Sequence, residues 1–365
     1  MNRRNLLMFG GTATVVVAAA VITFVGGGAV PSFVLTALAL SLLAMMVGHA
    51  TEELGTRMSA GATGVLQSAL GNLPELFVCI FSLRAGLVKV VQAALVGSIL
   101  ANSLLVLGLA ILVGGIRNGR QTFAAESPRM ISTLMLLAVG ALTVPTLAAQ
   151  LHTPAAGHLA ALSAACAVLV LIVFIASVPF SLRQDPERSP RHAGSAIPVR
   201  PSPAQLRNGV DAGWPLWLSV TTLILAAVGA AFVSEWFVRA LEPAMHALHL
   251  SEAFAGLVVV AIAGNAVENV VGIQLAAKDK PDYAISVILN SSLQIALGLI
   301  PVLVLLSFVL GGPVLTLVLP PLLVVALLLT TIISAVIVND GETIWLEGVA
   351  LIGLYGITAA AFWWG

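Results

Sequence analysis

The chain has 365 residues, of which 59% are hydrophobic and only 9% are charged. Soluble domains carry about a quarter charged residues, so this composition excludes a water-exposed globule and a disordered chain. The 16 basic and 16 acidic residues cancel, which excludes the basic surface that nucleic-acid binding requires. We therefore expect an all-α integral membrane protein. Its expected surroundings are the lipid bilayer, and no nucleic-acid partner is expected.

Apolar segments follow one another along the chain, each long enough to cross a bilayer core of about 30 Å. Eleven are predicted, at residues 6–26, 31–51, 60–83, 88–115, 129–150, 155–180, 214–238, 252–277, 282–310, 314–338 and 343–364. Arg3 and Arg4 precede the first one, as in a signal sequence. No clear cleavage site follows, so a retained transmembrane helix is expected.

A polar stretch with five arginines and five prolines, residues 181–213, separates two groups of apolar segments. The predicted organisation is an N-terminal helix in 1–30, a five-helix unit in 31–180, this basic linker, and a second five-helix unit in 214–365. If the N-terminus is cytoplasmic, 13 of the 16 Lys and Arg residues fall on the cytoplasmic side. Positive charge marks that side, so the N-terminus and the linker are predicted to be cytoplasmic.

The two five-helix units carry an internal repeat. Gly71–Glu75, with the sequence GNLPE, recurs 193 residues later as Gly264–Glu268, GNAVE, and the same displacement carries Ser98 onto Ser291. With a gap, Glu53 and Arg57 also match Glu235 and Arg239. A copy displaced by five helices, an odd number, enters the membrane from the opposite side. This inverted-repeat plan is typical of secondary transporters, whose substrate site lies where the repeats meet.

Glu75 and Glu268 are each the only charged residue within a long apolar segment. A carboxylate at that depth costs at least about 2.5–3.5 kcal/mol, and two at equivalent repeat positions indicate a site rather than a structural accident. Asn72 and Asn265 lie three residues earlier on the same helix face. Gly71, Gly264 and Pro74 favour local loosening of the helix, which frees backbone carbonyls. Oxygen ligands of this kind suit Ca²⁺ or Na⁺.

Hydroxyl and amide side chains of the following helices are candidates for a supporting shell. They are Ser98, Asn102, Ser291 and Gln294. Ser103 and Ser292 are expected only to join helices. Glu52, Glu53 and Glu235 lie at predicted helix ends. Surface ion pairs of Glu53 with Arg57 and of Glu235 with Arg239, and a role of these acids in proton or cation entry, both fit.

These motifs, together with Gly97–Asn102, Asn290–Ile295 and Trp345–Gly348, resemble the cation/Ca²⁺ exchanger superfamily and, within it, the H⁺/Ca²⁺ exchangers. The resemblance covers most of the membrane portion. It implies eleven helices, a Ca²⁺ site between the third and eighth helices, and alternating access moved by the second and seventh. Pro74 is closer to the Na⁺/Ca²⁺ branch, which leaves the coupling ion open.

The predicted function is secondary exchange of Ca²⁺ for H⁺ by alternating access, with Glu75 and Glu268 as a shared binding site and no resident cofactor. Two close carboxylates in a low dielectric cannot both stay charged without a cation, so protons replace Ca²⁺. Coupling to Na⁺, transport of Mn²⁺ or K⁺, and a cation channel stay open as alternatives. An intramembrane hydrolase lacks the expected motifs. Short loops favour a bacterial plasma membrane.

Overall fold

The computed structural model describes residues 3–58, 70–183 and 214–364. The first half contains α1 (Arg3–Val25), α2 (Ala29–Gly55), α4 (Leu73–Arg84), α5 (Val88–Leu100), the π-helix η1 (Ala101–Val106), α6 (Leu107–Asn118), α7 (Glu126–Gln150), the 3₁₀ turn η2 (Pro154–His158) and α8 (Leu159–Arg183). The linker predicted at 181–213 lies outside the described residues beyond Arg183.

The second half contains α9 (Leu216–Leu248), α10 (Glu252–Phe254), the π-helix η4 (Ala255–Val260), α11 (Ala261–Gly264), α12 (Ala266–Ala277), α13 (Pro281–Gln294), the π-helix η5 (Ile295–Leu299), α14 (Ile300–Ser307), α15 (Pro321–Ile337) and α16 (Trp345–Trp363). A two-residue ladder pairs β1 (Gln121–Thr122) with β2 (Glu342–Thr343).

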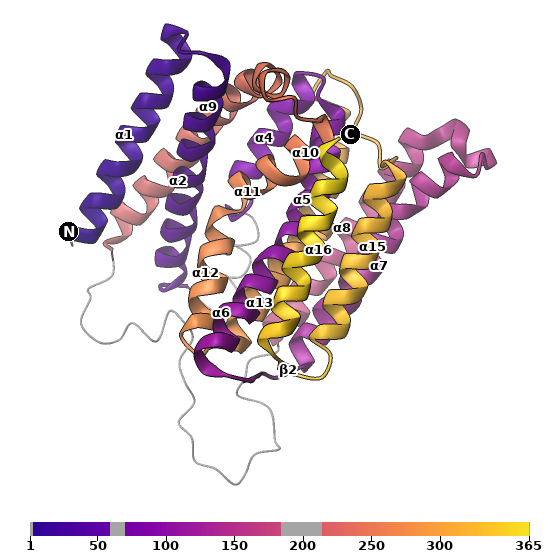
Figure 1. The fold of residues 1–365 in the computed structure, drawn as a ribbon. Helices are drawn as coiled ribbons and strands as arrows, with labels where there is room; N and C mark the ends of the chain where they lie inside the picture. Colours follow the sequence, from indigo (N-terminus) through magenta and orange to yellow (C-terminus); the bar gives the residue numbers. More distant parts are fainter. Residues whose placement is uncertain (1–2, 59–69, 184–213, 365) are drawn as a thin grey trace.

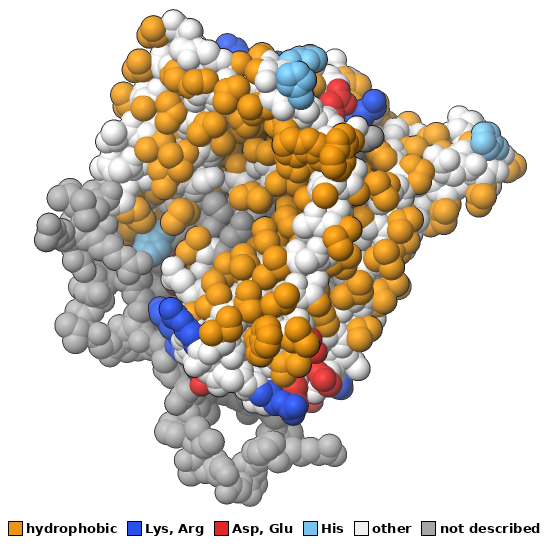
Figure 2. Space-filling model, in the orientation of Figure 1, with side chains coloured by type: hydrophobic (Ala, Val, Ile, Leu, Met, Phe, Trp, Pro, Cys, Tyr) orange, Lys and Arg blue, Asp and Glu red, His pale blue; other side chains and the backbone are white. Residues whose placement is uncertain are grey.

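The chain is an all-helical, multi-pass integral membrane protein. Within the described ranges, eight helices are long and apolar enough to cross a bilayer. Figure 2 shows hydrophobic side chains covering the middle of the molecule, with charged side chains gathered toward its two ends. A surface of this kind faces lipid in the middle and water at the ends.

The hydrophobic interior consists of two clusters. One centres on α1, α2 and α9, through residues such as Ala19, Leu40 and Phe237, and also includes residues of α4, α5 and η4. The other joins the remaining long helices. Figure 1 shows α1, α2 and α9 side by side at the left of the view, tilted against the other helices. The helices α1, α2 and α9 therefore form one group, which packs against the other helix group through α4, α5 and η4.

Most predicted segments coincide with helices, but α9 runs ten residues past the expected end at 238, to Leu248. Glu235 and Arg239 were interpreted as marking a helix end, which is wrong. They form an ion pair of 2.5 Å four residues apart, with both side chains exposed, and such a pair is compatible with a continuing helix. Glu53 lies two residues before the end of α2, so Glu53 and Glu235 do not occupy equivalent positions.

The tenth helix was expected from residue 314, and this is also wrong, because α15 begins only at Pro321. Pro320 has extended backbone angles, φ −52° and ψ 135°, as the residue before a proline prefers. The preceding stretch, 315–319, is non-helical, yet Leu315, Leu317 and Leu319 are buried.

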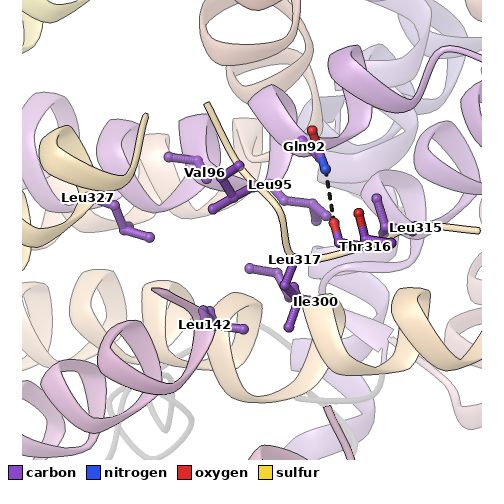
Figure 3. Close-up of a pocket in the computed structure, with 10 residues that line it drawn as sticks. Gln92, Leu95, Val96, Leu142, Ile300, Leu315, Thr316, Leu317 and Leu327 are labelled. Carbon is purple, nitrogen blue, oxygen red and sulfur yellow. Dashed lines mark hydrogen bonds between the residues drawn. The ribbon is translucent and has the colours of Figure 1, made fainter. Parts of the chain in front are cut away.

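Buried side chains from four helices satisfy the backbone of this stretch. Gln92 Nε2 donates to the carbonyl of Thr316 at 2.9 Å (Figure 3). It also donates to the carbonyl of Val318 at 3.1 Å. Thr146 Oγ1 donates to the Leu317 carbonyl and accepts from the Leu319 amide, both at 2.9 Å. The amides of Leu317 and Leu315 donate to the hydroxyls of Ser163 and Ser307, respectively, at 3.0 Å. Non-helical backbone is tolerated inside a membrane protein only with such partners.

Candidate functional site

Both GN motifs interrupt their helices at the asparagine. α4 begins immediately after Asn72, which has φ −94° and ψ 15°. α11 ends at Gly264 and α12 begins at Ala266, with Asn265 between them at φ −104° and ψ 26°. We call Gly71–Asn72 the first break and Gly264–Asn265 the second break. The predicted loosening is confirmed at both positions, and the two breaks have nearly the same conformation.

Glu75 lies in the first turn of α4, and its side chain is only 1% exposed. The hydroxyl of Ser98, from α5, donates a hydrogen bond to Glu75 Oε1. Asn265 Nδ2 donates to the same hydroxyl at 2.9 Å. One chain of hydrogen bonds thus runs from the second break through α5 to the carboxylate after the first break.

Asparagine oxygens at this site are available as acceptors. Asn265 Nδ2 uses its two hydrogens on Ser98 and on the Ala261 carbonyl, the latter at 3.0 Å. Asn102 Nδ2 donates to Ser291 Oγ at 3.0 Å. Both asparagines are buried, and within the described part of the chain neither Oδ1 atom has a hydrogen-bond partner. Buried acceptors without donors suit a bound cation.

The second motif is described only in part. Glu268 lies in the first turn of α12, but its side chain is outside the described residues. The backbone nevertheless brings the two motifs together, because a Cβ atom placed on Gly264 would lie 3.4 Å from Glu75 Cβ. Asn72 is 8% exposed and occupies the N-cap position of α4, without a side-chain capping hydrogen bond. Both breaks therefore border the Glu75 side chain.

Gly97, immediately before Ser98, permits a close helix crossing. A Cβ atom at this position would lie 2.4 Å from Leu257 Cα, in η4. A Cβ on Gly256 would in turn lie 2.4 Å from the Val90 carbonyl oxygen. Backbone contact at both glycines brings α5 against the segment that leads into the second break, which places Ser98 within reach of Asn265.

Sequence reasoning missed three π-helical segments beside the site, η1, η4 and η5. η1 follows Ser98 on the same continuous helix, and η5 begins directly after Gln294. Their first residues, Ala101 and Ile295, are 194 residues apart, close to the repeat displacement of 193. Single-turn π segments are frequent at functional sites. Only the repeat itself offered a signal, because hydropathy does not distinguish a π turn from an α turn.

Polar residues of η1 and α13 form hydrogen bonds with one another. Ser291 bonds Asn102, and Ser103 bonds Ser292 at 3.0 Å, as expected for a pair that joins helices. Gln294 is buried in the last turn of α13. Gln92, which was not predicted, supports the extended stretch at residues 315–319.

The three predicted gate residues lie apart from Ser98 and Asn265. Glu53 is only 2% exposed, so the expected surface position is wrong. Its Oε2 accepts the backbone amide of Trp214 at 3.2 Å, and Arg57 donates to the Trp214 carbonyl. Glu52 lies 3.8 Å from His49 Nδ1. Glu235 and Arg84 both line a surface cavity of about 290 Å³ between α9 and α4.

Known sodium/calcium exchangers and Ca²⁺/H⁺ antiporters match this chain over most of its length. The family model described as sodium/calcium exchanger protein matches residues 28–180 and 218–364. A Ca²⁺/H⁺ antiporter of Synechocystis sp. is 35% identical over 351 residues, which cover 93% of this chain and 92% of that protein. The Ca²⁺/H⁺ antiporter ChaA of Bacillus subtilis is 32% identical over 88% of each chain.

Solved structures agree in fold. The structure of native YfkE matches with a TM-score of 0.81 at 28% identity, covering 98% of this chain and 99% of that one. An H⁺/Ca²⁺ exchanger, CAX, matches with a TM-score of 0.70 over 97% of this chain and 92% of that one. Its 15% identity supports a shared fold alone.

Proposed function

The chain belongs to the sodium/calcium exchanger protein family, and from that premise we propose that it exchanges Ca²⁺ for H⁺ across the membrane by alternating access. The observation that carries the proposal is the placement of Glu75. Its carboxylate is buried between two helix breaks and is held by Ser98, which Asn265 holds in turn. The named antiporter activity of relatives that match over about nine-tenths of the chain supports the same conclusion.

Ca²⁺ and H⁺ compete for one site in this proposal. Glu75 and Glu268 bind Ca²⁺ when ionised, and the side-chain oxygens of Asn72 and Asn265 with break carbonyls complete an oxygen shell. When Ca²⁺ leaves, protons neutralise the carboxylates, since two negative charges cannot persist together in a low dielectric. Competition for one site, combined with access from one side at a time, is sufficient for exchange.

The finer architecture belongs to the proposal as well. It comprises eleven transmembrane helices: one N-terminal helix and two inverted five-helix repeats, in residues 31–180 and 214–365. The matching break conformations at Asn72 and Asn265 support it. A further match comes from α2 and α9, which end at Gly55 and Leu248, also 193 residues apart without any gap. The distribution of Lys and Arg supports a cytoplasmic N-terminus, and the bacterial antiporters support a bacterial plasma membrane.

The test is Ca²⁺ uptake into proteoliposomes under an imposed pH gradient, with and without Na⁺. Uptake that follows the pH gradient and needs no Na⁺ is the expected result. Uptake that requires a Na⁺ gradient would assign Na⁺ as the coupling ion, and substitution of Mn²⁺ or K⁺ for Ca²⁺ tests the cargo. A flux that ignores every counter-ion gradient would contradict exchange and indicate a channel.

A further inference from the structure

The crossing of α2 and α9 brings two serines, one from each helix, into comparable positions. Phe33 stacks on Phe237 with ring centroids 5.2 Å apart, and a Cβ on Gly229 would lie 3.2 Å from Leu43. Later residues of α2 thus oppose earlier residues of α9, so the two helices run antiparallel. Ser41 and Ser234 are separated by 193 residues, the displacement that relates the breaks and the ends of α2 and α9.

Ser41 contacts Ala263, the residue immediately before the second break. Its hydroxyl lies 2.9 Å from the Ala37 carbonyl of its own helix and 3.3 Å from the Ala263 carbonyl, across the boundary between the two helix groups. Ala263 is the penultimate residue of α11, and the last carbonyls of a helix ordinarily lack intrahelical donors. The single hydroxyl hydrogen of Ser41 is therefore shared between its own helix and the end of α11 at the candidate site.

The equivalent contact on the other side is open. Ser234 is fully buried, and its hydroxyl has no hydrogen-bond partner in the described ranges. The repeat displacement carries Ala263 onto Leu70, one residue before the first break. The Leu70 carbonyl would ordinarily accept from residue 74, but Pro74 has no N–H to donate. A buried donor without an acceptor is costly and calls for a physical explanation.

We propose that Ser41 and Ser234 are positioning residues that act in alternation. Each caps a backbone carbonyl immediately before a break: Ser41 that of Ala263, and Ser234 that of Leu70. In the conformation described here, Ser41 caps Ala263. In the opposite conformation, α2 and α9 shift together against the other helix group, Ser41 leaves Ala263, and Ser234 caps Leu70. Each shift uncovers one carbonyl and covers its counterpart. This inference rests on the proposed alternating access, and it assigns part of the energetic balance between the two conformations to these two hydroxyls.

The experiment measures that balance in the full chain. Ala85, exposed in the cavity between α4 and α9, is replaced by cysteine, and its modification by a membrane-impermeant maleimide is timed in proteoliposomes without Ca²⁺. The same protein without this cysteine supplies the background from Cys79 and Cys166. Because α9 forms the opposite wall, movement of α9 changes access to the reporter.

Ser41→Ala removes a hydrogen bond of one conformation, and Ser234→Ala removes a hydrogen bond of the other. We expect the two variants to shift the modification rate in opposite directions, by up to about fivefold each, the effect of one typical hydrogen bond on an equilibrium. The double variant should return to within about twofold of the parent. Thr36→Val, which removes a buried hydroxyl bonded only within α2, should shift nothing.

Shifts of both single variants in the same direction, or no shift in either, would overturn the proposal, since a merely structural defect gives no opposite and compensating effects. Ser41→Thr, which retains the hydroxyl, should restore the parental rate. Ca²⁺ uptake under a pH gradient is measured in the same vesicles. If the parent shows no exchange, the proposed function fails; if it exchanges normally and the labelling criteria fail, only the assignment of the serines is wrong.

Discussion

Asn265 and Ser98 lie 2.9 Å apart, side-chain nitrogen to hydroxyl oxygen, although 167 residues separate them in the sequence. The contact joins the second break to the helix that follows the first motif. Since the same hydroxyl donates to Glu75, a change at either break is transmitted to the carboxylate through one side chain. Both halves of the chain therefore help to hold the Glu75 carboxylate in place.

Ser98→Ala tests this link. The substitution removes the donor to Glu75 and leaves Asn265 Nδ2 without one of its two acceptors. Because a hydrogen bond to a charged group contributes about 1.5–3 kcal/mol, we expect the Ca²⁺ concentration at half-maximal uptake to rise by about tenfold or more. Ser103→Ala is the matched control, since Ser103 bonds Ser292 rather than a carboxylate. Equal effects of both substitutions would show that Ser98 only joins helices.

Glu75→Gln and Glu268→Gln test the two carboxylates. Each substitution keeps the size of the side chain and removes the charge that Ca²⁺ binding requires, so exchange should fall by at least about a hundredfold, as for loss of a group essential to function. Gel filtration in detergent should show an intact protein. The exposed Glu342→Gln, which breaks only a surface ion pair with Arg120, should transport normally. Normal exchange by either carboxylate variant would contradict the shared site.

The sequence predicted the centre of this site because burying a carboxylate in an apolar segment is costly, and because the repeat places two of them equivalently. It also predicted that Gly71 and Gly264 loosen their helices. The hydrogen bonds that unite Glu75, Ser98 and Asn265 depend on how α4, α5 and α11 cross. Crossing geometry is set by contacts distant in sequence, such as Gly97 against Leu257, and a hydropathy pattern carries no information about it.

The predicted helix boundaries are wrong where hydropathy and backbone conformation disagree. The stretch at 315–319 is as apolar as a helix but non-helical, and Pro320 with Pro321 was the available signal. Glu235 and Arg239 show the opposite case. Charged residues there predict a helix end, but α9 continues beyond them to Leu248. The contact between Glu53 and Trp214 joins segments 161 residues apart, and no local sequence pattern predicts it.

Glu53→Gln separates two roles for this residue. The sequence allowed a part in proton or cation entry, whereas the structure shows the carboxylate accepting the Trp214 amide. A glutamine oxygen accepts that amide equally well, so we expect exchange within about twofold of the parent and little change in thermal stability. Glu53→Leu removes the acceptor and should lower the melting temperature. Loss of exchange in the glutamine variant, with an unchanged melting temperature, would instead support proton or cation entry through Glu53.

Gln92→Leu tests whether the extended stretch is held by side chains. The substitution leaves two partly buried carbonyls, of Thr316 and Val318, without their donor, at about 1–3 kcal/mol for each unsatisfied group. We expect a clear fall of the melting temperature in detergent, with the half-saturating Ca²⁺ concentration unchanged in the protein that remains folded. Gln150→Leu, at an exposed position, is the control. An unchanged melting temperature would show that other contacts hold the stretch.

Gly97→Ala tests the close crossing that brings Ser98 to Asn265. The added methyl group would lie 2.4 Å from the Leu257 Cα, and backbone on both sides cannot yield as a flexible side chain does. Overpacking of this kind costs about 1–3 kcal/mol, and separation of α5 from η4 should also lengthen the contact between Ser98 and Asn265. We therefore expect a lower melting temperature together with weaker Ca²⁺ binding. Gly140→Ala, where a Cβ meets nothing within 4 Å, should leave both unchanged. If the two variants behave alike, backbone contact at Gly97 does not position the site.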